Sequence, residues 1–442
     1  AVFLGLALVL AGQLYRCTLR RSCATTLSLP ALTAYCGQES HRVGDLLQVC
    51  VHTTRRARAT LFRLGQSLEE VAWSAEIAPS HQSPEYDRWY GFRWEANLKI
   101  DSAELSPGAY CLHLEHLDDR TVTYRVPLLV RAAKPRAVAV VASTNTWQAY
   151  NDFGGLSNYA DRVTPWPLGW LKKLLAALNV QFHLGDRHHF PSVPLPVHRP
   201  NDAIDRDLQK LEACPIENFS HLLRAEWSLL RFFEQQDVEV NLYSDRDLAV
   251  DPEITEARLL VFNTHSEYWS EAMLGRLKAY LLAGRQALFV SGNNQYRKVD
   301  LLGDALMVYD FKTDAKATSE MLGAAYDARG YQSYGGYRVA APHHWLYDGM
   351  HVAAGDCFAH ASGANGQHQG GSGYETDKLT EHSGAVTVLA IGDNPEGPAY
   401  LVYKQVGRGA VLNTGSVASA PWVEKDPVLA GLVTRFVERA VS

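Results

Sequence analysis

The sequence of 442 residues lacks the short signatures of several common enzyme classes. It contains no GxSxG, so a serine nucleophile elbow is unsupported, and it contains no HExxH zinc-protease motif. Neither the P-loop pattern GxxxxGKS/T nor the dinucleotide-binding pattern GxGxxG occurs. No cysteine follows an apolar strand-like run, which argues against a thiol amidotransferase.

The chain also lacks an excess of positive charge and an organised set of cysteines. Its 42 basic and 48 acidic residues give a net charge of −6, which argues against a general nucleic-acid binder. The seven cysteines are scattered and contain no CxxC, so we expect reduced, buried thiols in a cytoplasmic protein.

No long hydrophobic run predicts a membrane span. Residues 1–12 are apolar but too short to cross a bilayer comfortably, and the basic residues follow this run instead of preceding it. We assign no role to the N-terminal segment 1–30, and a targeting function stays open as an alternative.

A period of two dominates residues 31–134. In the stretch 120–126, Val122, Tyr124 and Val126 alternate with polar residues. Short alternating strands separated by turn signals, with no long helix between them, predict a β-sandwich domain of about a hundred residues. Similar strands are expected at 46–53, 59–65 and 109–116.

The pattern changes over residues 135–442. Nearly continuous apolar runs alternate with helical segments, which predicts a doubly wound α/β domain built on a parallel sheet. Ser270 and Asp426 are expected to cap helices, and strands are also expected between 385 and 416. The apolar runs lie at 137–142, 238–244, 258–263 and 286–292, and the helices at 221–233, 271–283 and from about 427.

Three polar, aromatic stretches follow three of these apolar runs. They read STNTWQAYNDFGG (143–155), THSEYWS (264–270) and SGNNQY (291–296). In an open parallel sheet, ligand sites form outside the carboxyl ends of the strands. We therefore expect the three stretches to meet at one edge of the sheet.

The residue types in these stretches indicate a hard metal ion. His265 and Glu267 are two residues apart, and on an extended strand end such side chains point the same way. A carboxylate with phenolates is an anionic oxygen ligand set that suits hard ions better than thiolate-preferring ones. Spacing alone favours the alternative, a hydrogen-bonded pair that supports a turn.

The order TWQAYN…GG…SNY, then HSEYWS, then SGNNQY and a late GYETD resembles the large, catalytic subunit of N,N-dimethylformamidase and its relatives. The resemblance runs from roughly 33 to 440 and implies a β-sandwich followed by a glutamine-amidotransferase-like α/β domain. It also implies a metal-dependent amide hydrolase with a mononuclear Fe(III) held by two tyrosines and a glutamate.

By motif, the resemblance places the metal ligands at Tyr150, Tyr159 and Glu267, and the catalytic groups at His265, Asn293 and Glu375. The second tyrosine has an alternative place after Arg199-Pro200, where this chain has Asn201. Histidines of the same segment could compensate there, and these are His188, His189 and His198.

We therefore predict cleavage of the C–N bond of a small amide such as an N-alkylformamide. Trp147, Phe153 and Asn151 are predicted to contact the substrate, and Gly154 and Gly155 to turn the chain beneath the site. One alternative is a non-catalytic protein that binds a carbohydrate or a partner, and another is a metal-free acid/base hydrolase. Relatives assemble into larger complexes, so a homo-oligomer or a small second subunit is expected.

Overall fold

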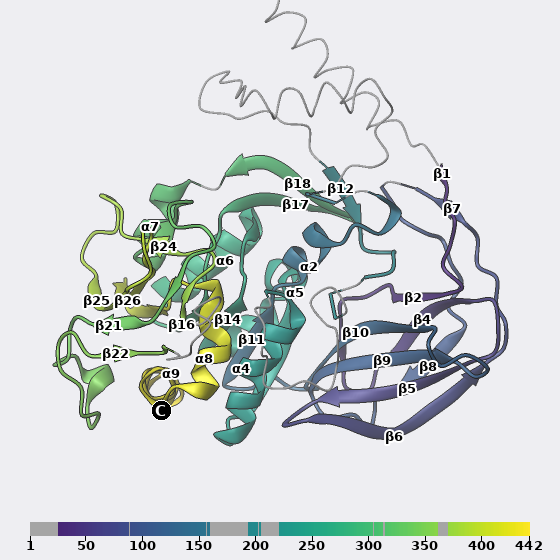
Figure 1. Cartoon of the computed structure of the whole chain (residues 1–442), viewed down its shortest axis with the longest axis horizontal. Helices are drawn as coiled ribbons and strands as arrows, with labels where there is room; N and C mark the ends of the chain where they lie inside the picture. The colour runs from purple at the N-terminus through teal and green to yellow at the C-terminus, as the bar shows by residue number, and fades with distance from the viewer. Residues whose placement is uncertain are drawn as a thin grey trace, which may run out of the picture.

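The computed structural model describes residues 25–87, 89–155, 157–159, 193–201, 203–204, 221–303, 305–312, 314–360 and 370–442. Figure 1 shows two adjoining parts: a strand-rich part from the first third of the chain, and a larger part in which helices cover a long sheet. Residues 1–24 of the N-terminal segment lie outside the described residues.

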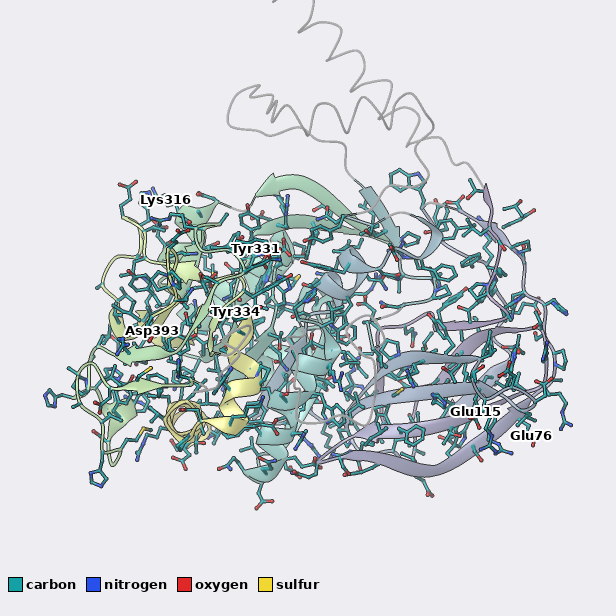
Figure 2. All side chains as sticks on the ribbon, viewed as in Figure 1. Glu76, Glu115, Lys316, Tyr331, Tyr334 and Asp393 are labelled. Atoms are coloured by element: carbon teal, nitrogen blue, oxygen red, sulfur yellow. The ribbon has the colours of Figure 1, made fainter. Side chains whose placement is uncertain are left out.

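The strand-rich part contains a five-stranded sheet in the order β3-β10-β9-β5-β6 and a three-stranded sheet in the order β2-β4-β8. Inward residues of both sheets, among them Val49, Leu61 and Leu112, form one apolar cluster. Glu76 lies on the edge strand β6 of the five-stranded sheet, and Glu115 lies on its central strand β9 (Figure 2). The strands are β2 Leu32–Cys36, β3 Ser40–Arg42, β4 Leu46–Thr53, β5 Ala57–Leu64, β6 Leu68–Ile77, β8 Leu98–Asp101, β9 Gly108–His116 and β10 Thr123–Arg131, and a short pair is formed by β1 Thr25–Thr26 and β7 Glu85–Tyr86.

The larger part is built on a nine-stranded sheet in the order β13-β11-β14-β16-β27-β26-β25-β21-β22. The first five strands of this order run parallel, and the remaining pairs are antiparallel. The strands are β11 Val138–Ala142, β13 Val240–Ser244, β14 Leu259–Thr264, β16 Gln286–Ser291, β21 Tyr337–Val339, β22 Cys357–Phe358, β25 Thr387–Gly392, β26 Tyr400–Val406 and β27 Gly409–Asn413.

The sheet is therefore mixed, where the sequence predicted a parallel one. Only two residues, Gly407 and Arg408, separate β26 from β27, and so short a connection can only join antiparallel neighbours. Gly407 has a φ of 59°, which a tight hairpin turn of this kind requires. The first half of the order, β13 to β27, is the region where the carboxyl ends of parallel strands meet.

Helices pack on both faces of the sheet. On one face, Val140 and Val261 pack with residues of α4 (Leu223–Gln235) and α9 (Pro427–Val441) in one apolar cluster. On the other face, Val141 and Phe262 pack with residues of α5 (Asp245–Val250), α6 (Glu271–Leu282) and α7 (Ala315–Leu322). Successive side chains of a strand thus point to opposite faces of the sheet, and because helices cover both faces, the strands are apolar at nearly every position.

The predicted helix caps are confirmed. Ser270 Oγ accepts a hydrogen bond from Met273 N at the start of α6, and Asp426 Oδ1 accepts from Val428 N and Leu429 N at the start of α9. The strand expected at 120–126 instead begins at Thr123, because Asp119 closes a turn by accepting from Thr121 N.

A second, four-stranded sheet lies over the carboxyl ends of the parallel strands. Its order is β12-β18-β17-β15, and Figure 1 shows β17 and β18 arching above the parallel strands near α2. The strands are β12 Val193–Pro196, β15 Tyr268–Ser270, β17 Arg297–Leu302 and β18 Ala305–Lys312. The remaining short elements are α2 Thr144–Tyr150, α8 Ala420–Lys425, β19 Ala325–Tyr326, β20 Tyr334–Gly335, β23 Ser372–Gly373 and β24 Asp377–Lys378, with single 3-10 turns at Phe153–Gly155, Pro252–Glu256, Trp345–Tyr347 and Val417–Ser419.

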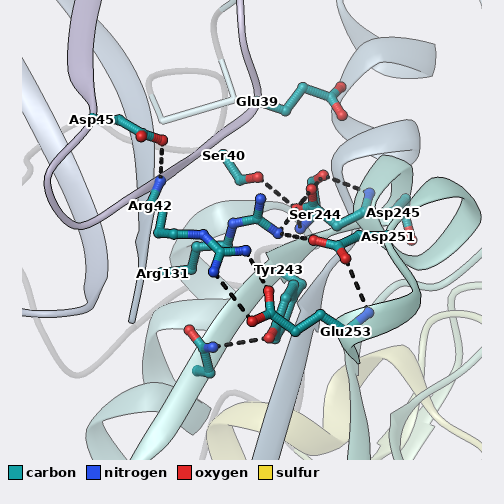
Figure 3. A network of polar contacts seen from close by, with 12 residues as sticks. Glu39, Ser40, Arg42, Asp45, Arg131, Tyr243, Ser244, Asp245, Asp251 and Glu253 are labelled. Atoms are coloured by element: carbon teal, nitrogen blue, oxygen red, sulfur yellow. Dashed lines mark hydrogen bonds and ion pairs between the residues drawn. The ribbon is translucent and has the colours of Figure 1, made fainter. Parts of the chain in front are cut away.

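A polar network joins the two parts of the molecule (Figure 3). Arg131, the last residue of β10, places Nη1 2.7 Å from Asp251 Oδ2 and 3.4 Å from Asp247 Oδ1. Arg42 pairs with Glu253. These ion pairs are partly buried, so screening by solvent weakens them less than it weakens surface pairs.

No described helix is long and apolar enough to cross a membrane.

Candidate metal centre

The helix α2 begins the site directly after β11. Its first turn is tied to the residues that directly follow the two neighbouring strands β13 and β14: Asn145 N donates to Asp245 Oδ2 at 2.9 Å, and Thr146 Oγ1 donates to His265 O at 2.7 Å. Asn145 Nδ2 also donates to Tyr268 O at 3.0 Å. These bonds fix α2 over the carboxyl ends of the sheet, with Tyr150 as its last residue.

The chain then turns back on itself. Gly154 and Gly155 both have a φ of 82°, a backbone conformation that is readily accessible only to glycine. Asn158 N donates to Ala149 O at 2.9 Å, which returns the chain to the end of α2. The ring of Tyr159 consequently lies 4.3 Å from the ring of Tyr150, measured between centroids.

The hydroxyl of Tyr159 reaches the segment that follows β14. It donates to Glu267 Oε2 at 3.3 Å and lies 2.8 Å from Tyr268 OH. Whole-residue exposure of Tyr159 is 54%, so the ring edge faces outward while the hydroxyl points toward buried groups. Tyr150, Tyr159 and Glu267 are thus brought together.

His265 lies between two carboxylates. Its Nε2 is 3.3 Å from Glu267 Oε2 and 2.9 Å from Glu375 Oε2. Glu375 comes from the connection between β23 and β24, far along the sequence, and accepts from Asn293 Nδ2 at 2.9 Å. The three predicted catalytic side chains therefore meet beside the three predicted ligands.

Burial keeps the phenols protonated in the absence of a cation. It raises the pKa of Tyr150 and of Tyr159 well above the usual range, and the negative charge of Glu267 adds to the effect at both. Burial raises the pKa of Tyr268 in the same way. A multivalent cation would reverse this balance, because it stabilises the phenolate form.

The imidazole and the second carboxylate are charged in this environment. Burial lowers the pKa of His265, but its contacts with Glu267 and Glu375 outweigh burial and raise the pKa to about 10. Burial raises the pKa of Glu375, but the interactions with His265 and Asn293 prevail and hold it below its usual value.

The cluster fits a hard metal ion. Two phenolates and Glu267 would present three negative charges on oxygen, a donor set that matches a trivalent hard ion. A second set shares Glu267: ligand atoms of His265, Glu267 and Glu375 all lie within 4.8 Å of one another. Both ring nitrogens of His265 and Asn293 Oδ1 are buried without an aligned hydrogen bond, which is uncommon in native proteins and which a bound ion at the site would account for.

The three predicted substrate-binding side chains are not brought to this cluster. Trp147 Nε1 donates to Glu226 Oε1 at 2.8 Å and packs in the apolar layer between the sheet and α4. Asn151 Nδ2 donates to Pro200 O at 2.9 Å, and Phe153 packs against Phe92 of the strand-rich part. These contacts replace the predicted substrate contacts with structural ones.

Three neighbouring residues escaped the sequence reasoning. Tyr268 lies within the HSEYW motif but received no predicted role, and its hydroxyl lies 2.8 Å from Tyr159 OH. The ring centroid of His221 lies 4.7 Å from that of Tyr150, and the ring of Tyr374 stacks on His221 at 5.6 Å. His221 precedes α4 without any motif, whereas the position of Tyr374 next to Glu375 could have indicated it.

Arg199 stabilises the end of α2. It is 1% exposed, and its guanidinium donates to the carbonyl oxygens of Gln148, Asn151 and Phe153. Asn201, the alternative place for the second tyrosine, accepts instead from Ala203 N, and the ring of His198 packs near Tyr35. His188 and His189 lie outside the described residues.

Comparison with known proteins gives one family. The family model described as "N,N-dimethylformamidase beta subunit-like, C-terminal" matches residues 58–310. The chain belongs to this family. The matched range contains Tyr150, Tyr159, His265, Glu267 and Asn293 of the cluster, whereas Glu375 lies beyond it. Comparison with curated proteins found no match.

Solved structures resemble this family member only weakly. A beta-galactosidase from Bacillus circulans sp. alkalophilus has a TM-score of 0.33 at 12% identity, over 51% of this chain and 29% of its own. One from Rahnella sp. R3 has a TM-score of 0.31 at 10% identity, over 48% and 27%. A putative ThuA-like protein from Parabacteroides merdae has 0.27 at 12%, over 49% and 83%. The chain spans less than a third of both galactosidases, and such likeness supports no argument about fold or activity.

Proposed function

We propose that this member of the family is a metal-dependent amide hydrolase and corresponds to the catalytic subunit. The observation that supports the proposal is the convergence of Tyr150, Tyr159 and Glu267 on one side of His265, with Glu375 on the other. These groups come from four separate segments, and His265, Glu267 and Glu375 are buried, which an incidental polar cluster rarely achieves.

Tyr150, Tyr159 and Glu267 would hold a mononuclear ferric ion. When bound, such an ion supplies polarisation of the scissile carbonyl and lowers the pKa of water at the site. Arg297 Nε lies 3.5 Å from Glu267 Oε1, so a cation of the protein balances part of the negative charge of the ligand set.

Glu375 and His265 would transfer protons during hydrolysis. Glu375 has a lowered pKa and is therefore a carboxylate at neutral pH, able to accept a proton from the attacking water. His265 is protonated at neutral pH, so it can donate a proton to the leaving amine and stabilise negative charge on Glu375. Asn293 orients Glu375 through its 2.9 Å hydrogen bond, so we assign it a positioning role.

Metal analysis and visible spectroscopy of the purified protein test the proposal. We expect about one iron per chain and a phenolate-to-iron charge-transfer band, both lost in Tyr150→Phe and Glu267→Gln. Tyr280→Phe is the matched control, because Tyr280 is a buried tyrosine whose hydroxyl donates to Ala257 O in another part of the fold. A colourless wild-type protein that takes up no iron would refute the iron assignment.

Release of amine from simple formamides tests the activity itself. The name of the family describes a subunit, so assembly with a second subunit is included in the proposal and is checked by the mass of the native complex. No amine release from the protein, alone or with a co-purified partner, would refute the hydrolase assignment even if iron is bound.

A further inference from the structure

Tyr268 is a buried tyrosine beside the proposed ligands and has no role in the proton transfers described above. It is 1% exposed, it follows Glu267 directly in the sequence, and its hydroxyl lies 2.8 Å from Tyr159 OH. A buried phenol at this place either binds the ion itself or acts on the ligand Tyr159. The two roles differ in where the proton of the phenol lies.

The neighbouring hydrogen bonds fix the direction of that proton. Asn158 Nδ2 donates to Tyr268 OH at 2.8 Å, so this amide occupies a lone pair of the phenol oxygen and leaves its proton free. Tyr159 OH donates its own proton to Glu267 Oε2 at 3.3 Å. Because a phenol has a single O–H to donate, Tyr268 must be the donor in its contact with Tyr159. The hydrogen bonds therefore run in one direction, from Asn158 through Tyr268 and Tyr159 to Glu267.

The same direction is required when a cation displaces the proton of Tyr159. A phenolate has no proton to donate, so Tyr268 is then the donor of the pair by necessity. Hydrogen bonds to ionised acceptors are shorter and roughly twice as strong as those between neutral groups. The contact between Tyr268 and Tyr159 would therefore strengthen when an ion binds, and Tyr268 itself would stay a neutral phenol.

The four-stranded sheet over the parallel strands holds Tyr268 in this position. Tyr268 begins β15 and belongs to an apolar cluster with one residue from each of the other three strands, Leu195, Val299 and Leu306. β15 pairs with β17 so that Tyr268 lies opposite Arg297, whose Nε is 3.5 Å from Glu267 Oε1. This one pair of residues thus places a phenol against the ligand Tyr159 and a cation against the ligand Glu267.

We propose that Tyr268 is a positioning residue that stays protonated and donates a hydrogen bond to the phenolate of Tyr159, without binding the ion itself. Partners of this kind orient a metal ligand and tune its strength as a donor, and their loss lowers metal affinity roughly 10- to 100-fold. The role rests on the proposed metal-dependent function, in which Tyr159 is a ligand.

Binding of gallium(III) tests whether Tyr268 keeps its proton. Gallium(III) is a hard trivalent ion without visible absorption, so ultraviolet difference spectra at saturating gallium count the tyrosines that ionise when it binds. We expect two tyrosinates, Tyr150 and Tyr159, in the wild type and also in Tyr268→Phe. If Tyr268 were a ligand, the substitution would remove one tyrosinate.

The iron-loaded protein tests the hydrogen bond itself. A donor stabilises the phenolate electron pair from which the charge-transfer band originates, so the band should move to longer wavelength in Tyr268→Phe. Iron affinity, measured by competition with citrate, should fall roughly 10- to 100-fold. Asn158→Leu removes only the amide that orients Tyr268 and should shift the band less, in the same direction. Tyr347→Phe is the matched control, because Tyr347 is also 1% exposed and its hydroxyl donates to Leu389 O, so this variant should change neither quantity.

The possible results distinguish this role from the proposed function. An unshifted band in Tyr268→Phe, or a tyrosinate count that falls with this substitution, overturns the role of Tyr268 and leaves the iron assignment standing. A wild type that binds neither ion overturns both. Absence of amide hydrolysis changes neither spectrum, so the hydrolase proposal can fail alone. Thermal unfolding checks that each variant folds. If Tyr268→Phe does not fold, three tyrosinates in the wild type or an unshifted band in Asn158→Leu overturns the role.

Discussion

Arg199→Met should destabilise the protein and displace Tyr150 at the same time. The guanidinium of Arg199 donates to Phe153 O at 3.0 Å, to Gln148 O at 3.1 Å and to Asn151 O at 2.9 Å. These carbonyls lie at or just beyond the end of α2, where a helix leaves its last carbonyl groups without internal partners. Arg199 is 1% exposed, so water cannot take over the bonds.

The size of the effect follows from these contacts. A hydrogen bond to a charged group stabilises the fold by about 1.5–3 kcal/mol. The variant loses three such bonds, and this loss exceeds the desolvation cost that it avoids by no longer burying a charge. Methionine fills most of the space of the arginine stem, so the cavity term is small. We expect the free energy of unfolding to fall by about 3 kcal/mol. Because Tyr150 precedes Asn151 directly, we also expect weaker iron binding.

Urea denaturation and iron analysis measure both effects. Arg338→Met is the control: Arg338 is exposed and pairs only at the surface, at 3.1 Å from Asp393, so the loss should stay within about 0.5 kcal/mol. Equal denaturation midpoints for the two variants would refute the proposed role of Arg199. Arg199→Lys keeps the charge without the planar fork and should recover only part of the stability.

Three further predictions follow from the same region. Burial raises the pKa of Glu226 from 4.5 to about 8, so the folded chain holds a proton that the unfolded chain releases, and the free energy of unfolding should fall as the pH rises between these values. The melting temperature, measured from pH 5 to 9, should therefore depend less on pH in Glu226→Gln than in the wild type, and an equal pH dependence in the two proteins would contradict this. Gly292→Ala places a Cβ 2.5 Å from Val417 N and 2.6 Å from Glu375 O, so it should lower the free energy of unfolding by about 1–3 kcal/mol and displace Glu375. In Gly275→Ala, within α6, the new Cβ has no neighbour within 4 Å, so this control should raise the free energy of unfolding by about 0.5–1 kcal/mol. Glu375→Gln should lower kcat roughly 10²- to 10⁴-fold while iron content is retained. The control Glu381→Gln, at an exposed carboxylate nearby in sequence, should change neither kcat nor iron content. Loss of iron in Glu375→Gln would instead favour the ligand set of His265, Glu267 and Glu375.

The positions of the strands and helices were largely predictable because local chemistry determines them. The apolar runs after residue 135 form strands that are buried on both faces, and the caps at Ser270 and Asp426 follow from side-chain oxygens next to free N–H groups. The antiparallel half of the sheet was missed because an apolar run does not reveal the direction of its neighbour. The glutamine-amidotransferase-like fold class stays a prediction.

The candidate site was predictable only where a family motif directly follows a parallel strand, because sites form at the carboxyl ends of such strands. Tyr150, His265, Glu267 and Asn293 follow parallel strands, so topology alone brings them together. Trp147 packs in the apolar layer between the sheet and α4 and donates to Glu226, and no sequence pattern in 143–155 indicates these contacts. His221 was missed because only tertiary packing selects it.

The position of Tyr150 depends on residues from widely separated parts of the chain. Glu39, from the strand-rich part, accepts from Thr144 Oγ1 at 3.1 Å, and Asp245 accepts from Asn145 N, so both act at the start of α2. Arg199 acts at its end. An isolated seven-residue helix would not be stable in water, so these contacts are what make α2 a fixed support. The position of Tyr150 therefore depends on contacts from both parts of the molecule, which gives the strand-rich part a structural role at the candidate metal centre although none of its described residues belongs to the proposed ligand set.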